Sequence, residues 1–170
     1  MITGKMHLAL LLVLLLVGML MADSKIEFWD QQRKGANCFN AEPQEQWFAA
    51  AHELGIEWVR LTYSKWKGQQ RDFLMGSADR FAGLVEEDLL RLTQVLDWAG
   101  KYDIKVVLTP LGLPGCRWRQ NNNMRPDLRL WQDKTYWPQA AQFWRELAGK
   151  LKDHPAICAY NILNEPTPEK

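Results

Sequence analysis

A carboxylic acid beside an amide stands near the end of the sequence, where Asn164, Glu165 and Pro166 follow an apolar segment. A carboxyl group held against a substrate can give a proton to a leaving oxygen and later take one from water. Arg60 closes an earlier apolar segment, and its guanidinium could contact a substrate. Two plainer interpretations stay open: the tripeptide is a turn that ends a strand, or Arg60 forms an ion pair under the loops.

Tryptophan is the unusual residue in the composition, with nine in 170 residues. An indole has a flat apolar face and a polar edge, which suits ligands that combine CH faces with hydroxyl groups, as sugars do. Each indole alone could equally be a packing residue. Four of them fall in two long connecting segments, at positions Trp66, Trp118, Trp131 and Trp137. Their grouping favours a carbohydrate ligand.

The elements that must position these residues alternate between strand and helix. Apolar segments predict four strands, at residues 35–40, 56–63, 104–110 and 156–163. Strands that alternate with helices predict a parallel sheet with right-handed crossovers, and thus an α/β fold. The apolar residues expected on the three helices are Trp47, Ala50, Ala51 and Leu54 after Pro43, then Phe81, Val85, Leu89, Leu92, Leu96 and Ala99, and lastly Ala140, Phe143, Trp144, Leu147 and Leu151.

The connections between these elements are unequal in length. Helix-to-strand links are short, whereas the strand-to-helix links span about residues 64–80 and 111–134. Long loops at the carboxyl ends of parallel strands mark the functional face of an α/β protein. The sequence therefore predicts that Arg60, Glu165 and the loop tryptophans share one face.

Other chemistries lack support in the sequence. The formal net charge is +1, so there is no electrostatic case for a nucleic-acid partner. No glycine-rich phosphate or dinucleotide motif follows the first strand, and no Gly-x-Ser-x-Gly elbow is present. The sequence holds three cysteines without a Cys-x-x-Cys pair or a His/Cys cluster, so we expect no zinc site. We expect neither a metal nor a cofactor, since carboxyl groups suffice for acid/base chemistry. Cys38, Cys116 and Cys158 are expected to be buried, inert thiols, and their odd number leaves their pairing open.

Two further groups of residues are assigned to structure rather than to chemistry. His52 and His154 fall on the helix-to-strand side, away from the predicted site. Asp127 and Asp133 interrupt a group of loop arginines, so we expect a solvated, turn-rich loop there rather than a basic patch. The arginines are Arg117, Arg119, Arg125 and Arg129.

The first 22 residues form a separate segment. Residues 8–22 are an apolar run behind the single cation Lys5, shorter than the roughly 20 residues of a membrane span. This pattern predicts a signal peptide at 1–22, with cleavage near Ala22, and a secreted or periplasmic protein with no membrane segment in its mature form. An uncleaved membrane anchor is the alternative. The domain then covers residues 23–170.

Four segments together resemble family 5 glycoside hydrolases, the cellulase-type family. They are Gly35-Ala-Asn37, Trp58-Val-Arg-Leu61, residues 104–108 with Pro114-Gly115, and residues 154–166, which end in Asn-Glu-Pro. The resemblance runs from about residue 35 to the end of the sequence, and its most specific part is residues 160–166. It implies a TIM-barrel hydrolase of β-linked glycans that retains the anomeric configuration.

The resemblance also implies roles for individual residues. Glu165 would be the general acid/base, Asn164 would bond the sugar hydroxyl next to the reacting carbon, and Arg60 would support the catalytic carboxylates. Asn37, Trp118 and Trp131 complete the expected substrate-binding set. The nucleophile of the family comes from strand seven.

Two departures from the family pattern stand out. Leu111 takes the position of a histidine that usually follows strand three, so the glycan is not specified. A (β/α)8 barrel takes roughly 250 residues, and this sequence supplies strands one to four and helices one to three. We therefore expect an apparently truncated N-terminal half-barrel that lacks the nucleophile glutamate. Its unpaired edge strands would pair with a C-terminal half-barrel or lead to self-association. The alternatives are a non-catalytic carbohydrate-binding half-barrel and an inactive truncated gene product.

Overall fold

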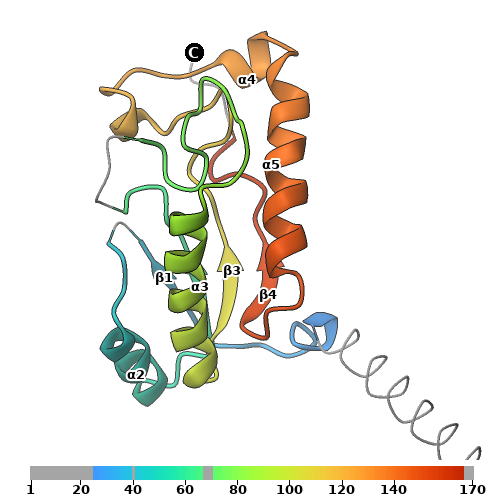
Figure 1. Ribbon diagram of the computed structural model, residues 1–170. Helices are drawn as coiled ribbons and strands as arrows, with labels where there is room; N and C mark the ends of the chain where they lie inside the picture. Colours follow the sequence, from blue (N-terminus) through green and yellow to red (C-terminus); the bar gives the residue numbers. More distant parts are fainter. Residues whose placement is uncertain (1–24, 40, 67–70, 167–170) are drawn as a thin grey trace, which may run out of the picture. The chain divides into compact units, whose positions relative to one another are not determined.

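The computed structural model describes residues 25–39, 41–66 and 71–166 (Figure 1). The chain divides into two compact units, Met1–Arg33 and Lys34–Lys170. The signal peptide predicted at 1–22 lies outside the described residues, as does the cleavage site near Ala22. Within the described ranges, no helix is long and apolar enough to cross a membrane.

The second unit alternates strands and helices in the predicted order. Its paired strands are shorter than the apolar segments that predict them, and two short helices in the long loop before α5 were not predicted. The elements are β1 (Gly35–Cys38), α2 (Glu45–Glu53), β2 (Trp58–Leu61), α3 (Glu86–Lys101), β3 (Lys105–Leu108), η1 (Arg119–Asn121), α4 (Arg129–Gln132), α5 (Tyr136–Leu151) and β4 (Ile157–Tyr160).

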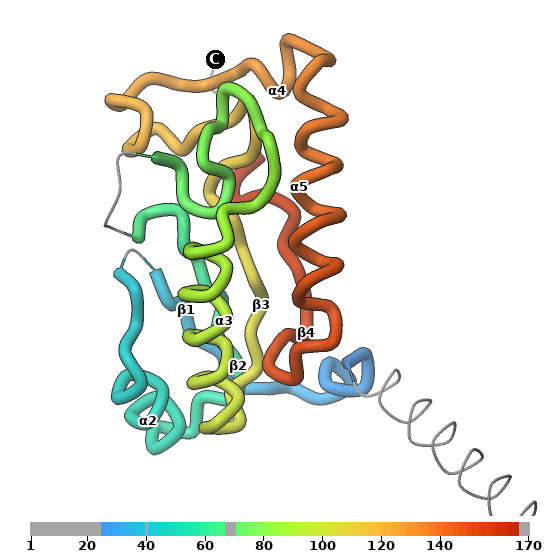
Figure 2. Tube along the Cα trace, in the orientation of Figure 1, coloured from blue at the N-terminus to red at the C-terminus, as the bar shows by residue number. Residues whose placement is uncertain are grey.

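The four strands form one parallel sheet in the order β1-β2-β3-β4, which confirms the predicted topology (Figure 2). The register is regular from β1 to β3. Between β3 and β4 it shifts by one residue, because Val106 pairs with Ile157 while Val107 pairs with Ala159. Cys158 is thus an extra residue in β4, and a bulge of this kind bends the strand that carries it.

Alternate residues of the strands face opposite sides of the sheet. On one side, Val59, Leu61, Val106 and Leu108 are completely buried in the core. Leu92 and Leu96 of α3 and Phe143 and Leu147 of α5 belong to the same core cluster. Figure 1 shows α3 and α5 side by side on the same side of the sheet. The residues between the buried ones in β2 and β3 are partly exposed: Trp58, Arg60, Lys105 and Val107.

The helical faces differ from the prediction in two places. In α2, Phe48 is completely buried, whereas three of the four expected core residues, Trp47, Ala50 and Leu54, are exposed. The phenyl ring has no polar atom to keep in water, so its burial fixes the rotation of the helix. Helix α3 begins at Glu86, so Phe81 precedes it. Phe81 still reaches the core, where its ring meets that of Phe143 edge-on at 5.7 Å.

The prediction that the three cysteines are buried is confirmed. Cys38, Cys116 and Cys158 are buried, and none of the three forms a disulfide. Burial raises the pKa of the Cys38 thiol to about 11. A thiol of this kind stays protonated at neutral pH and behaves as a small apolar side chain.

The edges of this sheet generate a stability prediction. Within the described part of the chain, β1 pairs only with β2, and β4 only with β3. Unpaired edges of a parallel sheet expose backbone donors and acceptors that favour pairing with another chain. We expect the 170-residue chain to associate with rising concentration in size-exclusion chromatography and to unfold at low urea. A stable monomer with a sharp urea transition would contradict this.

Candidate active site

The carboxyl ends of three strands meet at Asn164. The residue follows β4, its backbone N–H donates to the carbonyl oxygen of Pro110 beyond β3 (3.0 Å), and its side-chain Oδ1 accepts a hydrogen bond from Arg60 of β2. Asn164 is buried. The amide is therefore fixed by two neighbouring strands and cannot rotate freely.

Glu165 is the residue that this arrangement presents to solvent. Its side chain is exposed, although Asn164 beside it is buried. Its backbone has a φ of +46°, in the left-handed region that L-residues other than Gly, Asn and Asp rarely adopt. The chain turns sharply here, and this turn places a carboxyl group at the rim of the sheet beside a fixed amide.

Arg60 acts through Asn164. Within the described ranges its guanidinium donates to an amide oxygen rather than to a carboxylate. Its guanidinium lies 5.3 Å from the ring centre of Phe39, where a cation–π contact supports it. Asn37 pairs with Arg60 across β1 and β2, so both residues occupy one row of the sheet. Asn37 is exposed and does not line the pocket described next.

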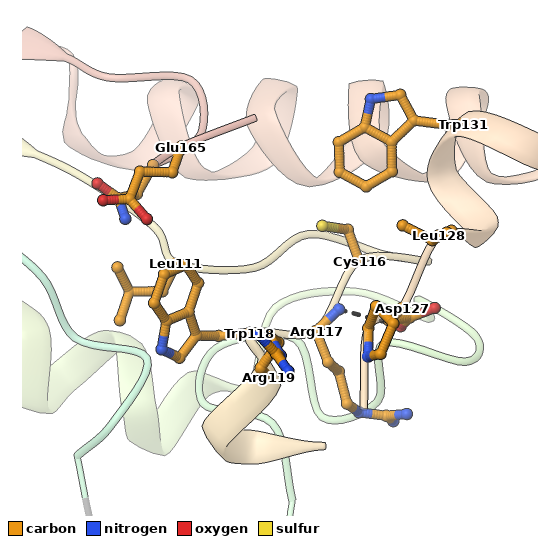
Figure 3. A pocket seen from close by; sticks show the side chains of 11 residues that line it. Leu111, Cys116, Arg117, Trp118, Arg119, Asp127, Leu128, Trp131 and Glu165 are labelled. Atoms are coloured by element: carbon orange, nitrogen blue, oxygen red, sulfur yellow. Dashed lines mark hydrogen bonds between the residues drawn. The ribbon is translucent and has the colours of Figure 1, made fainter. Parts of the chain in front are cut away.

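A pocket of about 370 Å³ lies beside the end of β4 (Figure 3). Figure 3 shows Glu165 and Leu111 toward one end of it, Trp131 and Leu128 toward the other, and Cys116 between them. The structure thus brings together four of the six predicted site residues, Asn164, Glu165, Trp118 and Trp131. The complete lining is Leu111, Cys116, Arg117, Trp118, Arg119, Pro126, Asp127, Leu128, Trp131, Asn164 and Glu165.

The four loop tryptophans divide into two kinds. Trp118 and Trp131 line the pocket, and Trp131 is 36% exposed there. Trp66 is buried and packs edge-on against Phe73 at 5.1 Å, so it is a core residue. The prediction that Trp137 is a loop residue is wrong, because it lies in the first turn of α5. It is outside the pocket lining and donates its indole N–H to the carbonyl oxygen of Leu130 (2.8 Å). The suggested carbohydrate role therefore narrows to Trp118 and Trp131.

Leu111 occupies the floor of the pocket at the position where the family pattern has histidine. Its side chain is buried, and its backbone N–H donates to Ser64 Oγ (2.9 Å). The turn that follows requires Gly115, which has a φ of +76°. A Cβ atom on Gly115 would approach the ring of Tyr136 to 2.5 Å, so the loop closes onto the start of α5 only with glycine.

A network of charges joins the two long loops, and the sequence interpretation missed it. Arg117 binds Asp72 and Asp79 of the loop between β2 and α3, each through its guanidinium. Arg129 binds Asp79 at 2.7 Å and also Asp127. The hydrogen bond from Arg117, and to a smaller extent that from Arg129, holds the pKa of Asp79 well below its ordinary value, although partial burial would raise it. Arg117 and Arg129 are thus structural cross-links rather than residues of a solvated loop.

Asp127 is the buried member of the network. Burial alone would raise its pKa, but hydrogen bonds from Arg129 and from the backbone N–H of Arg117 (3.0 Å) outweigh it, and the pKa lies below the ordinary value. Figure 3 shows the second of these bonds as a dashed line. Both oxygens of Asp127 also face the Arg129 guanidinium, at 2.7 and 2.8 Å. This carboxylate is therefore occupied, although its residue lines the pocket.

A second buried carboxylate fixes the loop between β2 and α3. Asp88, in the first turn of α3, is almost completely buried, accepts the backbone N–H of Leu74 (2.9 Å) and pairs with Arg71 through both guanidinium nitrogens. Leu74 is itself buried with a φ of +64°. The spacing of Asp88 from its partners, 14 and 17 residues, gives no local sequence signal.

The charge network predicts a pH-dependent contribution to stability. Because the folded-state pKa of Asp127 is lowered, its stabilisation is complete above its unfolded pKa of about 4 and is lost as the pH falls below it. We expect Asp127→Asn to lower the urea midpoint at pH 6 and to lower it much less at pH 3. Asp153→Asn, at a side chain that is 89% exposed, is the control and should change little at either pH. An Asp127→Asn effect of equal size at both pH values would contradict the prediction.

Comparisons with known proteins find a matching family and similar sequences. The family model described as Cellulase (glycosyl hydrolase family 5) matches residues 22–170. Among curated proteins, a Beta-xylosidase of Phanerodontia chrysosporium is 33% identical over 119 residues, which cover 67% of this chain and 23% of that protein. Glucan 1,3-beta-glucosidase D of Emericella nidulans is 28% identical over 129 residues, 72% of this chain and 15% of that protein.

A search of solved structures finds a protein with a similar fold. The Pseudomonas stutzeri endoglucanase Cel5A in complex with cellobiose is 25% identical, with a TM-score of 0.54 over 73% of this chain and 32% of that chain. The chain therefore spans about a third of this structure and less than a quarter of the two curated relatives. The parallel four-stranded sheet with its helices corresponds to the N-terminal half of a (β/α)8 barrel, as predicted. From its sequence match and its fold, the chain belongs to glycosyl hydrolase family 5.

Proposed function

We propose that this chain carries the acid/base half of a retaining glycosidase site for β-linked oligo- or polysaccharides. The observation that supports it is the pocket at the carboxyl end of the sheet, where an exposed Glu165, a fixed Asn164 and two tryptophans share one lining. The similar proteins are named as an endoglucanase, a beta-xylosidase and a glucan 1,3-beta-glucosidase. All three names describe glycosidases.

In the proposed first step, Glu165 gives its proton to the glycosidic oxygen while the bond between that oxygen and the anomeric carbon breaks and a second carboxylate, the nucleophile, bonds to that carbon. In the second step water attacks the anomeric carbon, the bond to the nucleophile breaks, and the Glu165 carboxylate takes the proton of the water. Asn164, held by Arg60, would bind a hydroxyl of the reacting sugar. Trp118 and Trp131 would lie against the CH faces of the ligand. Neither step requires a metal or a cofactor.

A retaining mechanism needs a second carboxylate about 5–5.5 Å from the first. Asp127 is the one other carboxylate in the described lining, and Arg129 and the Arg117 backbone occupy it. We therefore place the nucleophile outside the 170 residues, in the part of the barrel that longer relatives have. The partner would be that C-terminal half-barrel, or a second copy of the chain. A secreted or periplasmic location, with removal of residues 1–22, belongs to the same proposal.

A second candidate function is glycan binding without cleavage. The observation that favours it is the same occupied Asp127, which leaves Glu165 as the free carboxylate of the described pocket. The two candidates differ in whether the pocket can activate a glycosidic bond once a nucleophile is supplied.

Adding a nucleophile from solution distinguishes the two candidate functions. Azide can attack the anomeric carbon of a bound β-glycoside on the face opposite to the leaving group, while Glu165 gives its proton to the departing oxygen. The products are then an α-glycosyl azide and the free alcohol. We expect the 170-residue chain to form no reducing sugar from 4-nitrophenyl and methylumbelliferyl β-glycosides alone, and to form the α-glycosyl azide when azide is added. Detection is by NMR and by release of the chromophore.

The matched variants are Glu165→Gln and Glu146→Gln, the second on α5 outside the pocket. Glu165→Gln should reduce azide-dependent turnover of a methyl β-glycoside, whose alcohol leaves only with a proton, by about a hundredfold or more, in line with the usual value of a general acid. It should reduce turnover of the 4-nitrophenyl glycoside much less, since nitrophenolate leaves with little help from an acid. Glu146→Gln should leave both unchanged. Binding without azide-dependent turnover would support the second candidate. Hydrolysis without azide would show that the chain holds its own nucleophile.

A further inference from the structure

Leu111 and Trp118 form the wall of the pocket nearest to Glu165 (Figure 3). They flank a tight turn of the loop after β3, in which Leu113 and Cys116 exchange two backbone hydrogen bonds (2.9 and 2.8 Å). Those bonds hold the turn together but do not join it to a neighbouring strand. The position of this wall relative to Glu165 therefore depends on contacts that reach the flanking residues from outside the turn.

Ser64, shortly after the end of β2, reaches the segments on both sides of this turn. Its hydroxyl oxygen accepts the backbone N–H of Leu111 (2.9 Å), and its carbonyl oxygen accepts a side-chain N–H of Asn121 (2.6 Å). Asn121 donates its own backbone N–H to the carbonyl oxygen of Trp118 (2.8 Å). One residue beside the neighbouring strand therefore holds Leu111 and also the short helix η1 that follows Trp118.

Lys65, the next residue, contacts the ring of Trp118. Its Nζ lies 5.9 Å from the ring centre, within the range of a cation–π interaction. The indole N–H is buried and has no hydrogen-bond acceptor among the described residues. With its polar edge turned away from solvent, the indole offers a sugar its carbon face rather than its N–H.

Ser64 also supports the buried amide of Asn164. The carbonyl oxygen of Pro110, which precedes Leu111, accepts the backbone N–H of Asn164 (3.0 Å). A displacement of this segment would therefore move Asn164 as well as the Leu111 side chain. The hydroxyl of Ser64 restrains the segment directly, through the bond to the Leu111 N–H.

We propose that Ser64 is a positioning residue, which holds Leu111 and Trp118 at the spacing on which sugar binding depends. The inference rests on the proposed function, because it takes the pocket beside Glu165 as the glycan site. Ser64 and Asn121 lie outside the lining of that pocket, so they act on a ligand through the groups that they hold.

The affinity of the 170-residue chain for disaccharides tests the proposal. Cellobiose, xylobiose and laminaribiose are compared by calorimetry, and the one that binds most tightly is used for the variants. Ser64→Ala and Asn121→Ala each remove one bond of Ser64, and each should weaken binding by about three- to tenfold, the range that corresponds to one lost hydrogen bond. Ser64→Thr keeps the hydroxyl group and should bind as tightly as the unchanged chain.

Asn122→Ala is the matched control. A side-chain N–H of Asn122 donates to the carbonyl oxygen of Arg125 (2.9 Å), so the bond is of the same kind but stays within one loop. Asn122 also lies outside the pocket lining, and its loss should leave the affinity unchanged. In a chain that carries Trp118→Ala, Asn121→Ala should have no further effect, because the indole through which it acts is gone.

The azide reaction separates positioning from a general loss of structure. A displaced wall raises KM for the 4-nitrophenyl glycoside and leaves kcat nearly unchanged, whereas a smaller folded fraction lowers kcat and leaves KM unchanged. A fall in kcat alone would contradict the proposal. Circular dichroism shows whether each variant folds, and Asn121→Ala, at an exposed side chain, keeps the proposal testable where Ser64→Ala does not fold.

The binding results also distinguish this proposal from the proposed function. If Asn121→Ala and Asn122→Ala bind the disaccharide equally well, the positioning role of Ser64 is wrong while the proposed function stands. If the unchanged chain binds none of the three disaccharides, both are wrong.

Discussion

The hydrogen bond from Arg60 to Asn164 is the contact on which the candidate site depends. It joins residues 104 positions apart and connects β2 with the end of β4 across β3. Parallel strands place their carboxyl ends at one edge, but this alone leaves each side chain free to rotate. The bond removes that freedom from Asn164. Since Glu165 is the next residue, its backbone is held beside this contact while its side chain is exposed.

Ion pairs between the two long loops also hold the residues around the candidate site in place. The loop between β2 and α3 and the loop between β3 and α5 carry complementary charges, and Arg117 and Arg129 join them through Asp72, Asp79 and Asp127. Such pairs contribute little when fully exposed, but Asp72 and Asp127 are largely or completely buried. The network fixes the backbone on both sides of Trp118. It also keeps the charged ends of Arg117 and Asp127 occupied.

Much of this could be predicted from the sequence, and the reasons for the rest are physical. The order of elements, the parallel sheet and the side on which the site lies follow from apolar periodicity and loop length. Asn-Glu-Pro at the end of an apolar strand drew attention to Glu165 and Asn164, and the resemblance to family 5 glycoside hydrolases gave them their expected roles. Their surroundings were not found, since the partners of Arg117 lie 38 and 45 residues away. Periodicity reports which residues are apolar, and it says nothing about which charges meet when two loops fold together.

The backbone of Glu165 has a consequence for how the chain can change. A left-handed φ costs roughly 1–2 kcal/mol for a residue with a side chain of this kind and almost nothing for glycine. Selection for stability alone would therefore replace glutamate at this position by glycine or asparagine. The carboxyl group of Glu165 thus stands on a backbone that favours a smaller residue, and Glu165→Gly would relieve the backbone while it removes the carboxyl group.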